Sequence, residues 1–594
     1  MKSLFDKTFL TALLLVCCVF AAQAQTDWYD PMEAEEPYIN GRAWNQEIGR
    51  HYQRLPERFK DKVSKAVWSL SHHTAGLYVK FVTRSRHISV RYVCTAPTTG
   101  YPNVVALNQS GVDLYVTDVH GADHWICNRM GYSFHLNHSD TVEIRYHDIT
   151  VPRQTRQSVE YTLYLPTYNG LKSMRIGVDK GERFQFIRDS QERPIVVYGT
   201  SIAHGASASR PGLIWPTRVQ RELGYPVINL GFSGSAKMEP AIFDMLSEID
   251  ARLYMIDAVP NCTGLDDSTF TARFLGGMRA LRAKTKAPIL VADGNYLPYH
   301  SWNDGFNGQG RHKDSLQLRL FRQLQQEGMQ DLYYLSERDF NFCEDDYIEG
   351  RHPNDLGMKR YADAYEGALS RILIGADTMR AYQPCVQRRD RIYEWMERHN
   401  EVIKRNRETQ PQVVMIGNSI THFWGGKPDC TLKSGEKSWN KLFKGWRVTN
   451  MGFGWDRVEN VYWRLRHGEL DDCRPEHVFL LIGINNVGQP AAQVASGIVD
   501  IVKLIRKLQP QARLHVIKPY PARKREQWVL DLDAELDKQL QPDAMTDVSD
   551  PGKGLLLQDG SGKIDEKYFR DGLHPIESGY EILAKTYKKL LKRK

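Results

Sequence analysis

Cysteine is scarce in this chain of 594 residues, which has only nine. No Cys-x-x-Cys and no His-Glu-x-x-His sequence occurs, so nothing in the sequence supports a bound metal, and we predict no metal or other cofactor. The thiols are also too few for a disulfide scaffold. Cys94 and Cys127 lie in one β-rich region and form a candidate pair.

Long apolar runs are equally rare. The run over residues 9–20 is too short to span a bilayer, and it is followed by Ala22-Gln23-Ala24. We therefore predict a cleavable signal peptide over residues 1–24 and a periplasmic or secreted protein. A retained membrane anchor and a lipoprotein signal at Cys17 are the alternatives. No other segment of the sequence is long and apolar enough to cross a membrane.

The chain also lacks a concentrated basic segment of the kind that binds nucleic acid. Its net charge of +8 is spread along the sequence, and the basic residues at 588–594 are typical of a solvated last helical turn. We expect no nucleic-acid partner and no membrane span, and the oligomeric state stays open. With 41% hydrophobic and 25% charged residues, the composition is that of a soluble globular protein. The length suggests about three or four domains.

Residues 25–192 alternate apolar and polar side chains with period two. Segments 77–82, 87–93 and 141–146 have the pattern of half-buried antiparallel strands. Short strands between turn residues predict an all-β sandwich, here called the sandwich. Because this part shows no nucleophile with an accompanying base, we interpret it as an accessory domain.

Two later stretches alternate buried strands with helical patterns. They span residues 193–379 and 411–594, here called the first and second α/β domains, and residues 380–410 predict a linker helix between them. This alternation is typical of an α/β fold with a parallel sheet between helices. The predicted strands are 195–198, 227–230, 253–256 and 289–292 in the first, and 413–416, 448–450, 478–482 and 514–517 in the second.

One chemical motif occurs in both α/β domains. The first strand of each ends in Gly-x-Ser, which places Ser201 and Ser419 at the carboxyl edge of a parallel sheet, where α/β proteins bind ligands. Later in each domain comes an acid-Gly-x-His-Pro run. A carboxylate three residues before a histidine can orient the imidazole, which then takes the serine proton. The predicted catalytic sets are Ser201, Glu349 and His352, and Ser419, Asp571 and His574.

These motifs resemble those of the SGNH, or GDSL-like, hydrolase family. The α/β-hydrolase alternative is not matched, because neither serine sits in Gly-x-Ser-x-Gly. The resemblance implies two flavodoxin-like three-layer domains. In the family, a glycine after the second strand and an asparagine after the third form the oxyanion hole with the serine amide. The implied donors are Gly234 and Asn261 in the first domain, and Trp455 and Asn485 in the second.

Two positions depart from the family pattern. Glu349 replaces the usual aspartate, and Asp345 and Asp346 are alternative partners for His352. Trp455 stands at the usual glycine position, where a large ring would narrow the acyl pocket. Either departure is compatible with an inactive domain.

Two further segments resemble particular branches of the family. Val461-Tyr462-Trp463-Arg464-Leu465 and Gly468-Glu469-Leu470 are similar to the catalytic subunit of intracellular platelet-activating factor acetylhydrolase. Gly111-Val112-Asp113-Leu114-Tyr115 in the sandwich is similar to the Gly-x-Asp-Leu-Tyr motif of a domain that precedes another SGNH branch. The sandwich and the first α/β domain are therefore expected to work as a unit.

The resemblance and the predicted export favour a serine esterase that removes O-acetyl groups from carbohydrates, such as sialic acid or a plant or host glycan. One alternative is an exported lipid or lysophospholipid esterase. Another is a glycan-binding protein with one or both sites inactive. Arg210, which follows the first nucleophile, either binds an acidic sugar or forms a structural salt bridge.

Overall fold

The computed structural model describes residues 26–98, 100–118, 121–128, 141–150, 159–296, 302, 308–373 and 393–593. The predicted signal peptide, Cys385 and the first part of the linker lie outside these residues. Among the described residues, no helix combines the length and apolar character needed to cross a bilayer. Cys94 is buried and Cys127 is exposed, and both are free thiols, so the candidate disulfide is wrong.

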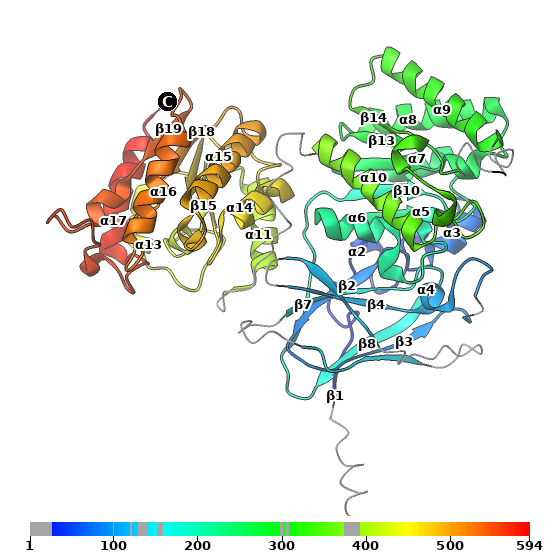
Figure 1. Cartoon of the computed structure of the whole chain (residues 1–594), viewed down its shortest axis with the longest axis horizontal. Helices are drawn as coiled ribbons and strands as arrows, with labels where there is room; N and C mark the ends of the chain where they lie inside the picture. Colours follow the sequence, from blue (N-terminus) through cyan, green and yellow to red (C-terminus); the bar gives the residue numbers. More distant parts are fainter. Residues whose placement is uncertain are drawn as a thin grey trace, which may run out of the picture.

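The amino-terminal part consists of two antiparallel sheets, which confirms the predicted sandwich (blue and cyan in Figure 1). Their strand orders are β1-β8-β3-β6 and β5-β4-β7-β2-β9. Apolar side chains of both sheets, such as Val79, Val90, Ile144 and Leu163, form one core. The strands are β1 (Thr26–Tyr29), β2 (Tyr78–Thr83), β3 (Ile88–Cys94), β4 (Asp113–Thr117), β5 (Asp123–Ile126), β6 (Val142–Tyr146), β7 (Val159–Tyr164), β8 (Leu171–Asp179) and β9 (Phe184–Ile187). Short helices α2 (Asn45–Ile48), α3 (Lys65–Ser71) and α4 (Ala106–Ser110) interrupt them.

The first α/β domain has a parallel sheet of order β11-β10-β12-β13-β14. Alternate residues of a strand point to opposite faces, so Ile195 and Val197 join one core and Val196 and Tyr198 the other. Two cores on one sheet are the three-layer arrangement that the motifs implied. The strands are β10 (Ile195–Gly199), β11 (Val227–Gly231), β12 (Leu253–Asp257), β13 (Ile289–Ala292) and β14 (Leu332–Leu335). The helices are α5 (Ser201–His204), α6 (Trp215–Leu223), α7 (Pro240–Leu246), α8 (Asp267–Lys284), α9 (Gly308–Gln326) and α10 (Asp355–Leu373).

The second α/β domain repeats this topology, with sheet order β16-β15-β17-β18-β19. In both sheets the first strand in the sequence lies between the second and the third, which is the flavodoxin-like order. The strands are β15 (Val413–Gly417), β16 (Val448–Gly452), β17 (His477–Leu481), β18 (Arg513–Ile517) and β19 (Thr546–Ser549). The helices are α12 (Ser419–His422), α13 (Glu436–Leu442), α14 (Val458–Arg464), α15 (Ala491–Leu508), α16 (Glu526–Gln539) and α17 (Glu577–Leu590).

Helix α11 (Trp395–Thr409) lies within the predicted linker and packs on the second α/β domain. Its buried side chains Trp395, Met396 and Val402 belong to the same core as Val414 and Ile416 of β15. The apolar spacing that predicted this helix is therefore explained by its contact with the domain that follows.

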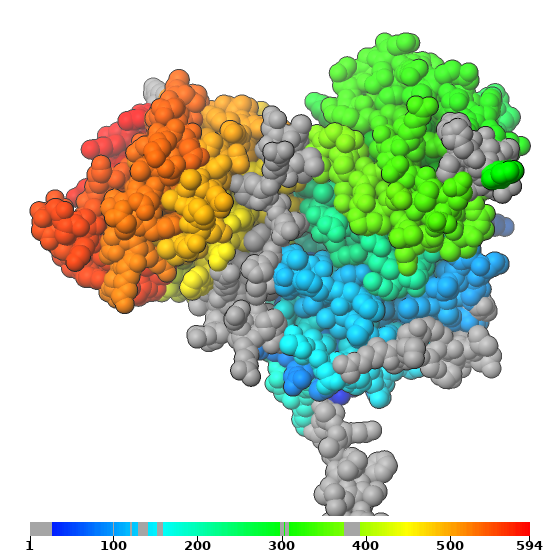
Figure 2. Space-filling view, in the orientation of Figure 1, coloured from blue at the N-terminus to red at the C-terminus, as the bar shows by residue number. Residues whose placement is uncertain are grey.

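Largely buried polar contacts join the second α/β domain to Glu192, at the end of the sandwich, and to the first α/β domain. Glu192 lies 2.6 Å from Nδ1 of His467, and Arg252 donates to Asp471 at 2.9 Å. Glu192 and Arg252 precede β10 and β12, and Asp471 precedes β17, so these contacts involve the amino-terminal edges of the sheets. Both candidate serines follow the carboxyl ends of strands, away from this interface. The two domains form separate lobes in Figure 2 (green, and yellow to red).

The Gly-x-Asp-Leu-Tyr motif joins the sandwich to the first α/β domain. The Asp113 carboxylate accepts from Arg210 at 2.5 Å, from the Gly212 amide at 2.9 Å and from the Trp125 indole at 2.7 Å. The Tyr115 hydroxyl lies 2.8 Å from the same arginine. Burial raises the pKa of Asp113, and Arg210 opposes that shift. Of the two interpretations of Arg210, the structure supports the salt bridge.

Removal of the Asp113 carboxylate should therefore destabilise the chain and disturb the loop after Ser201. Because it leaves a largely buried arginine unpaired, Asp113→Ala should cost about 3 kcal/mol of unfolding free energy in urea denaturation. Arg145→Ala breaks the more exposed pair with Glu143 and should cost less than about 1 kcal/mol. Equal losses for the two variants would contradict a structural role for Asp113.

Candidate active sites

Close backbone packing positions both nucleophiles. A Cβ on Gly231 would lie 2.4 Å from the His204 amide nitrogen, and a Cβ on Gly452 would lie 2.3 Å from that of His422. Only glycine permits this approach of the second strand to the short helix that begins at the serine. The helix caps are also equivalent. The side chains of Thr200 and Asn418 each accept a hydrogen bond from the backbone N–H two residues later in the chain.

The first site brings together the three residues predicted from its motifs. Ser201 Oγ lies 2.8 Å from His352 Nε2. The Glu349 carboxylate contacts His352 Nδ1 and accepts the His352 backbone N–H at 3.1 Å. Of the alternative acids, Asp346 instead accepts from the Cys343 amide at 2.7 Å and pairs with Arg360. Glu349 is thus the carboxylate that the structure places on the imidazole.

The second site has the same arrangement. Ser419 Oγ lies 2.9 Å from His574 Nε2, and Asp571 Oδ2 lies 2.8 Å from His574 Nδ1. Burial opposes ionisation of Asp571, but hydrogen bonds from the backbone and ring of His574 and from the Leu573 amide lower its pKa to about 2. Asp571 is therefore ionised at neutral pH and can stabilise a protonated imidazole.

The predicted oxyanion donors lie on equivalent turns. Gly234 and Trp455 each follow the second strand by three residues and share a left-handed backbone, with φ of +68° and +66°. Asn485 Nδ2 donates to the Asp456 carbonyl at 2.9 Å, beside Trp455. Asn261 Nδ2 lies 3.4 Å from the Phe232 carbonyl, and the opposite amide orientation places its oxygen 3.3 Å from the Gly234 nitrogen. At both sites the asparagine contacts the turn that should bind the oxyanion.

The turn at Trp455 is held by buried groups on both sides. The Asp456 carboxylate accepts from the Trp395 indole and from Arg464, each at 2.8 Å. The Gly454 carbonyl accepts from the Tyr393 hydroxyl at 2.9 Å. The Trp455 side chain itself is 49% exposed. The surroundings thus maintain a backbone conformation that is unfavourable for a residue with a Cβ.

Three ring side chains follow Ser419 closely in the sequence, namely His422, Phe423 and Trp424. Of these, Phe423 lies against the catalytic histidine. Its ring centroid is 5.3 Å from that of His574. Trp424 is buried and stacks on Tyr580. His422 accepts the Gly454 amide at 3.2 Å, and burial holds its pKa well below the usual range. As a neutral acceptor, His422 supports the oxyanion turn, a role that its sequence position alone did not indicate.

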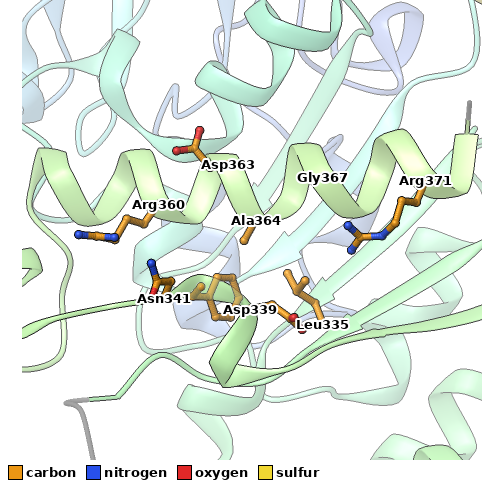
Figure 3. Close-up of a pocket in the computed structure, with 9 residues that line it drawn as sticks. Leu335, Asp339, Asn341, Arg360, Asp363, Ala364, Gly367 and Arg371 are labelled. Carbon is orange, nitrogen blue, oxygen red and sulfur yellow. The ribbon is translucent and has the colours of Figure 1, made fainter. Parts of the chain in front are cut away.

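A small cavity lies beside the first site. It has a volume of about 40 Å³ and is lined by neighbours of Asn261, such as Pro260, and neighbours of His352, such as Gly350 and Arg351. A larger cavity, of about 290 Å³, lies between α10 and the segment from Leu335 to Asn341. Figure 3 shows Arg360 and Arg371 towards opposite ends of this second cavity, which includes none of the candidate catalytic residues.

One residue near the first site had no signal in the sequence. The side-chain amide of Asn103, from the sandwich, lies 3.1 Å from His352 Nδ1.

Histidine, cysteine and acidic side chains form no group able to hold a metal ion within the described ranges.

Comparison with known proteins identifies the family. Models described as the GDSL-like lipase/acylhydrolase family match residues 192–370 and 415–582. A model described as the N-terminus of an SGNH-hydrolase-type esterase matches residues 26–184. The chain belongs to the GDSL-like lipase/acylhydrolase family and carries two such domains. It is an esterase or acylhydrolase of the SGNH type.

Individual relatives match parts of the chain. Platelet-activating factor acetylhydrolase IB subunit alpha1 of Pongo abelii is 32% identical over 206 residues, which are 34% of this chain and 83% of that protein. The alpha2 subunit of Bos taurus is 30% identical over 204 residues, which are 33% and 83%. The crystal structure of a GDSL-type lipase-like protein from Bacteroides ovatus is 28% identical with a TM-score of 0.52, and the match covers 59% of this chain and 98% of that one.

The left-handed turn at Trp455 predicts an unusual order of stability. Trp455→Gly and Trp455→Ala both remove the ring, but only alanine keeps the Cβ that disfavours a positive φ. We expect the glycine variant to be more stable than the alanine variant by about 1 kcal/mol in urea unfolding.

Gly234→Ala, at the equivalent turn of the first α/β domain, is the matched control and should lose about 1 kcal/mol relative to the unmodified chain. An alanine variant of Trp455 as stable as the glycine variant would show that the turn does not impose this conformation.

Proposed function

We propose that the protein is an exported serine esterase with two catalytic sites, which removes O-acetyl groups from carbohydrates such as sialic acid or a plant or host glycan. The observation that carries this proposal is the presence of two Ser–His–acid arrangements, with serine-to-histidine distances of 2.8 and 2.9 Å. Export rests on the signal-peptide pattern of residues 1–24.

The same chemistry applies at both sites. Histidine Nε2 takes the serine proton as Oγ attacks the ester carbonyl, and the acid stabilises the resulting imidazolium. The tetrahedral oxyanion is stabilised by the serine amide, the amide of Gly234 or Trp455, and the asparagine side chain. The histidine proton then passes to the leaving alcohol, and water releases the acid from the acyl-enzyme in a second round. Loss of one oxyanion donor typically raises the barrier by roughly 3 to 4 kcal/mol.

The composition of the chain favours a short acyl group. The mean hydropathy is −0.50, and long apolar runs are rare in the sequence, so neither feature supports the apolar funnel expected of a lipase. An acetyl group on a polar alcohol fits this composition.

A lipid ester is the second candidate substrate for the second site. The observation that favours it is the 32% identity to a subunit whose name specifies the hydrolysis of an acetyl group from platelet-activating factor. A glycan-binding protein without activity has less support, because both sites retain serine, histidine and acid in hydrogen-bonding geometry.

Single and double serine variants test this proposal. Because the sites lie away from the interface between the domains and share no residue, Ser201→Ala and Ser419→Ala should each remove a distinct part of the substrate profile, and the double variant should be inactive. The measurement is acid release from O-acetylated glycans and from simple esters of increasing acyl length. Activity should be highest on acetyl esters.

Ser561→Ala, in an exposed loop of the second α/β domain, is the control and should retain the full profile. Loss of all turnover in either single variant would contradict two independent sites. A preference for long acyl chains would favour the lipid candidate, and glycan binding without any turnover would overturn the esterase proposal.

A further inference from the structure

One loop of the sandwich reaches the catalytic histidine of the first active site. This loop lies between β3 and α4, and Tyr101 and Val104 exchange backbone hydrogen bonds of 3.1 and 3.2 Å across it. Asn103 lies between them, and its amide nitrogen Nδ2 lies 3.1 Å from His352 Nδ1. Asn103 and His352 are 249 residues apart in the sequence. They meet at Nδ1 of the imidazole, whereas Ser201 contacts Nε2 on the other side of the ring.

The position of Asn103 is fixed by contacts to the nucleophile loop. Ser207, six residues after the nucleophile, donates its hydroxyl to the Asn103 carbonyl at 2.9 Å. Val104 is buried against Tyr168 and Ala206. The Tyr168 hydroxyl in turn donates to the Ser201 carbonyl at 3.3 Å. Asn103 is therefore anchored to the same segment that carries the nucleophile.

The mechanism requires a particular protonation state of His352. For Nε2 to accept the serine proton, the hydrogen of the neutral imidazole must be on Nδ1, and an acceptor must hold it there. Glu349 supplies one acceptor, but its side chain is 41% exposed and has one more methylene than the aspartate usual in the family. The Asn103 amide supplies a second when it is rotated by 180°, because this rotation places the oxygen at nearly the position that Nδ2 occupies, 3.1 Å from Nδ1.

We propose that Asn103 is a positioning residue for His352, which shares the Nδ1 hydrogen with Glu349 and makes the first active site dependent on the sandwich. This inference rests on the proposed function of the Ser201 site. A neutral amide is chemically sufficient for the role, since Cys–His–Asn sites orient their histidine in this way. The second α/β domain follows α11 rather than a sandwich.

The test uses the full chain with Ser419→Ala, so that only the Ser201 site is active. Asn103→Leu, which keeps the size but has no acceptor, should lower kcat on an acetyl ester by about tenfold and change KM by less than about twofold, because the residue acts through His352 and not on substrate. Asn103→Asp restores an acceptor and should recover most of kcat. Val105→Ala, an exposed change in the same loop, is the control and should leave kcat unchanged.

Combination with Glu349→Leu, which removes the other acceptor, provides the sharper measurement. If both residues hold the same hydrogen, the Asn103→Leu/Glu349→Leu double variant should fall about tenfold below the product of the two single effects, which is within the range of coupling between residues in contact. Additive losses, or a thermal unfolding temperature that falls in parallel with kcat across the series, would overturn the positioning role.

The design separates this inference from the proposed function. If the Ser419→Ala chain hydrolyses no ester, the esterase assignment of the first site fails and the positioning role fails with it. If that chain is active and Asn103→Leu retains full kcat, only the role of Asn103 is overturned.

Discussion

The close approach of two backbone segments at the carboxyl edge of each parallel sheet is the constraint on which both sites depend. At Gly231 and Gly452 a Cβ would collide with the helix that begins at the serine, so glycine is required there. This contact holds the nucleophile above the sheet and brings the oxyanion turn beside it. The histidine and the acid then arrive together on one loop, because they are only three residues apart. Repetition of this geometry, with serine-to-histidine distances of 2.8 and 2.9 Å, gives the chain two equivalent Ser–His–acid arrangements.

The two centres are stabilised by different surroundings. The first relies on the sandwich, through the buried pair of Asp113 with Arg210 and through the amide of Asn103 at His352. The second relies on α11 and on the buried ion pair of Asp456 with Arg464, which hold the turn at Trp455. Since the surroundings of a serine site determine which alcohol and acyl group can approach, these differences support distinct substrates for a single type of chemistry.

Local sequence patterns were sufficient to predict much of this molecule. The central strands of both sheets are continuous apolar runs, and Gly-x-Ser and acid-Gly-x-His-Pro are short enough to be read directly. Strands β14 and β19 were missed, because β14 is partly exposed and β19, Thr546–Ser549, contains mostly polar residues. The sequence alone could not decide whether Glu349 or Asp346 contacts His352, because that contact depends on the geometry of the loop. Asn103 has no sequence signal at all, because its role depends on a contact between distant segments.

The central claim is that Ser201 and Ser419 are both activated nucleophiles. The most direct measurement is the intact mass of the full chain after reaction with a fluorophosphonate, which modifies only an activated serine, followed by peptide mapping. The account predicts two adducts per chain, at Ser201 and Ser419, and one adduct for each single Ser→Ala variant. A single adduct on the unmodified chain, no adduct, or labelling at other serines would contradict it.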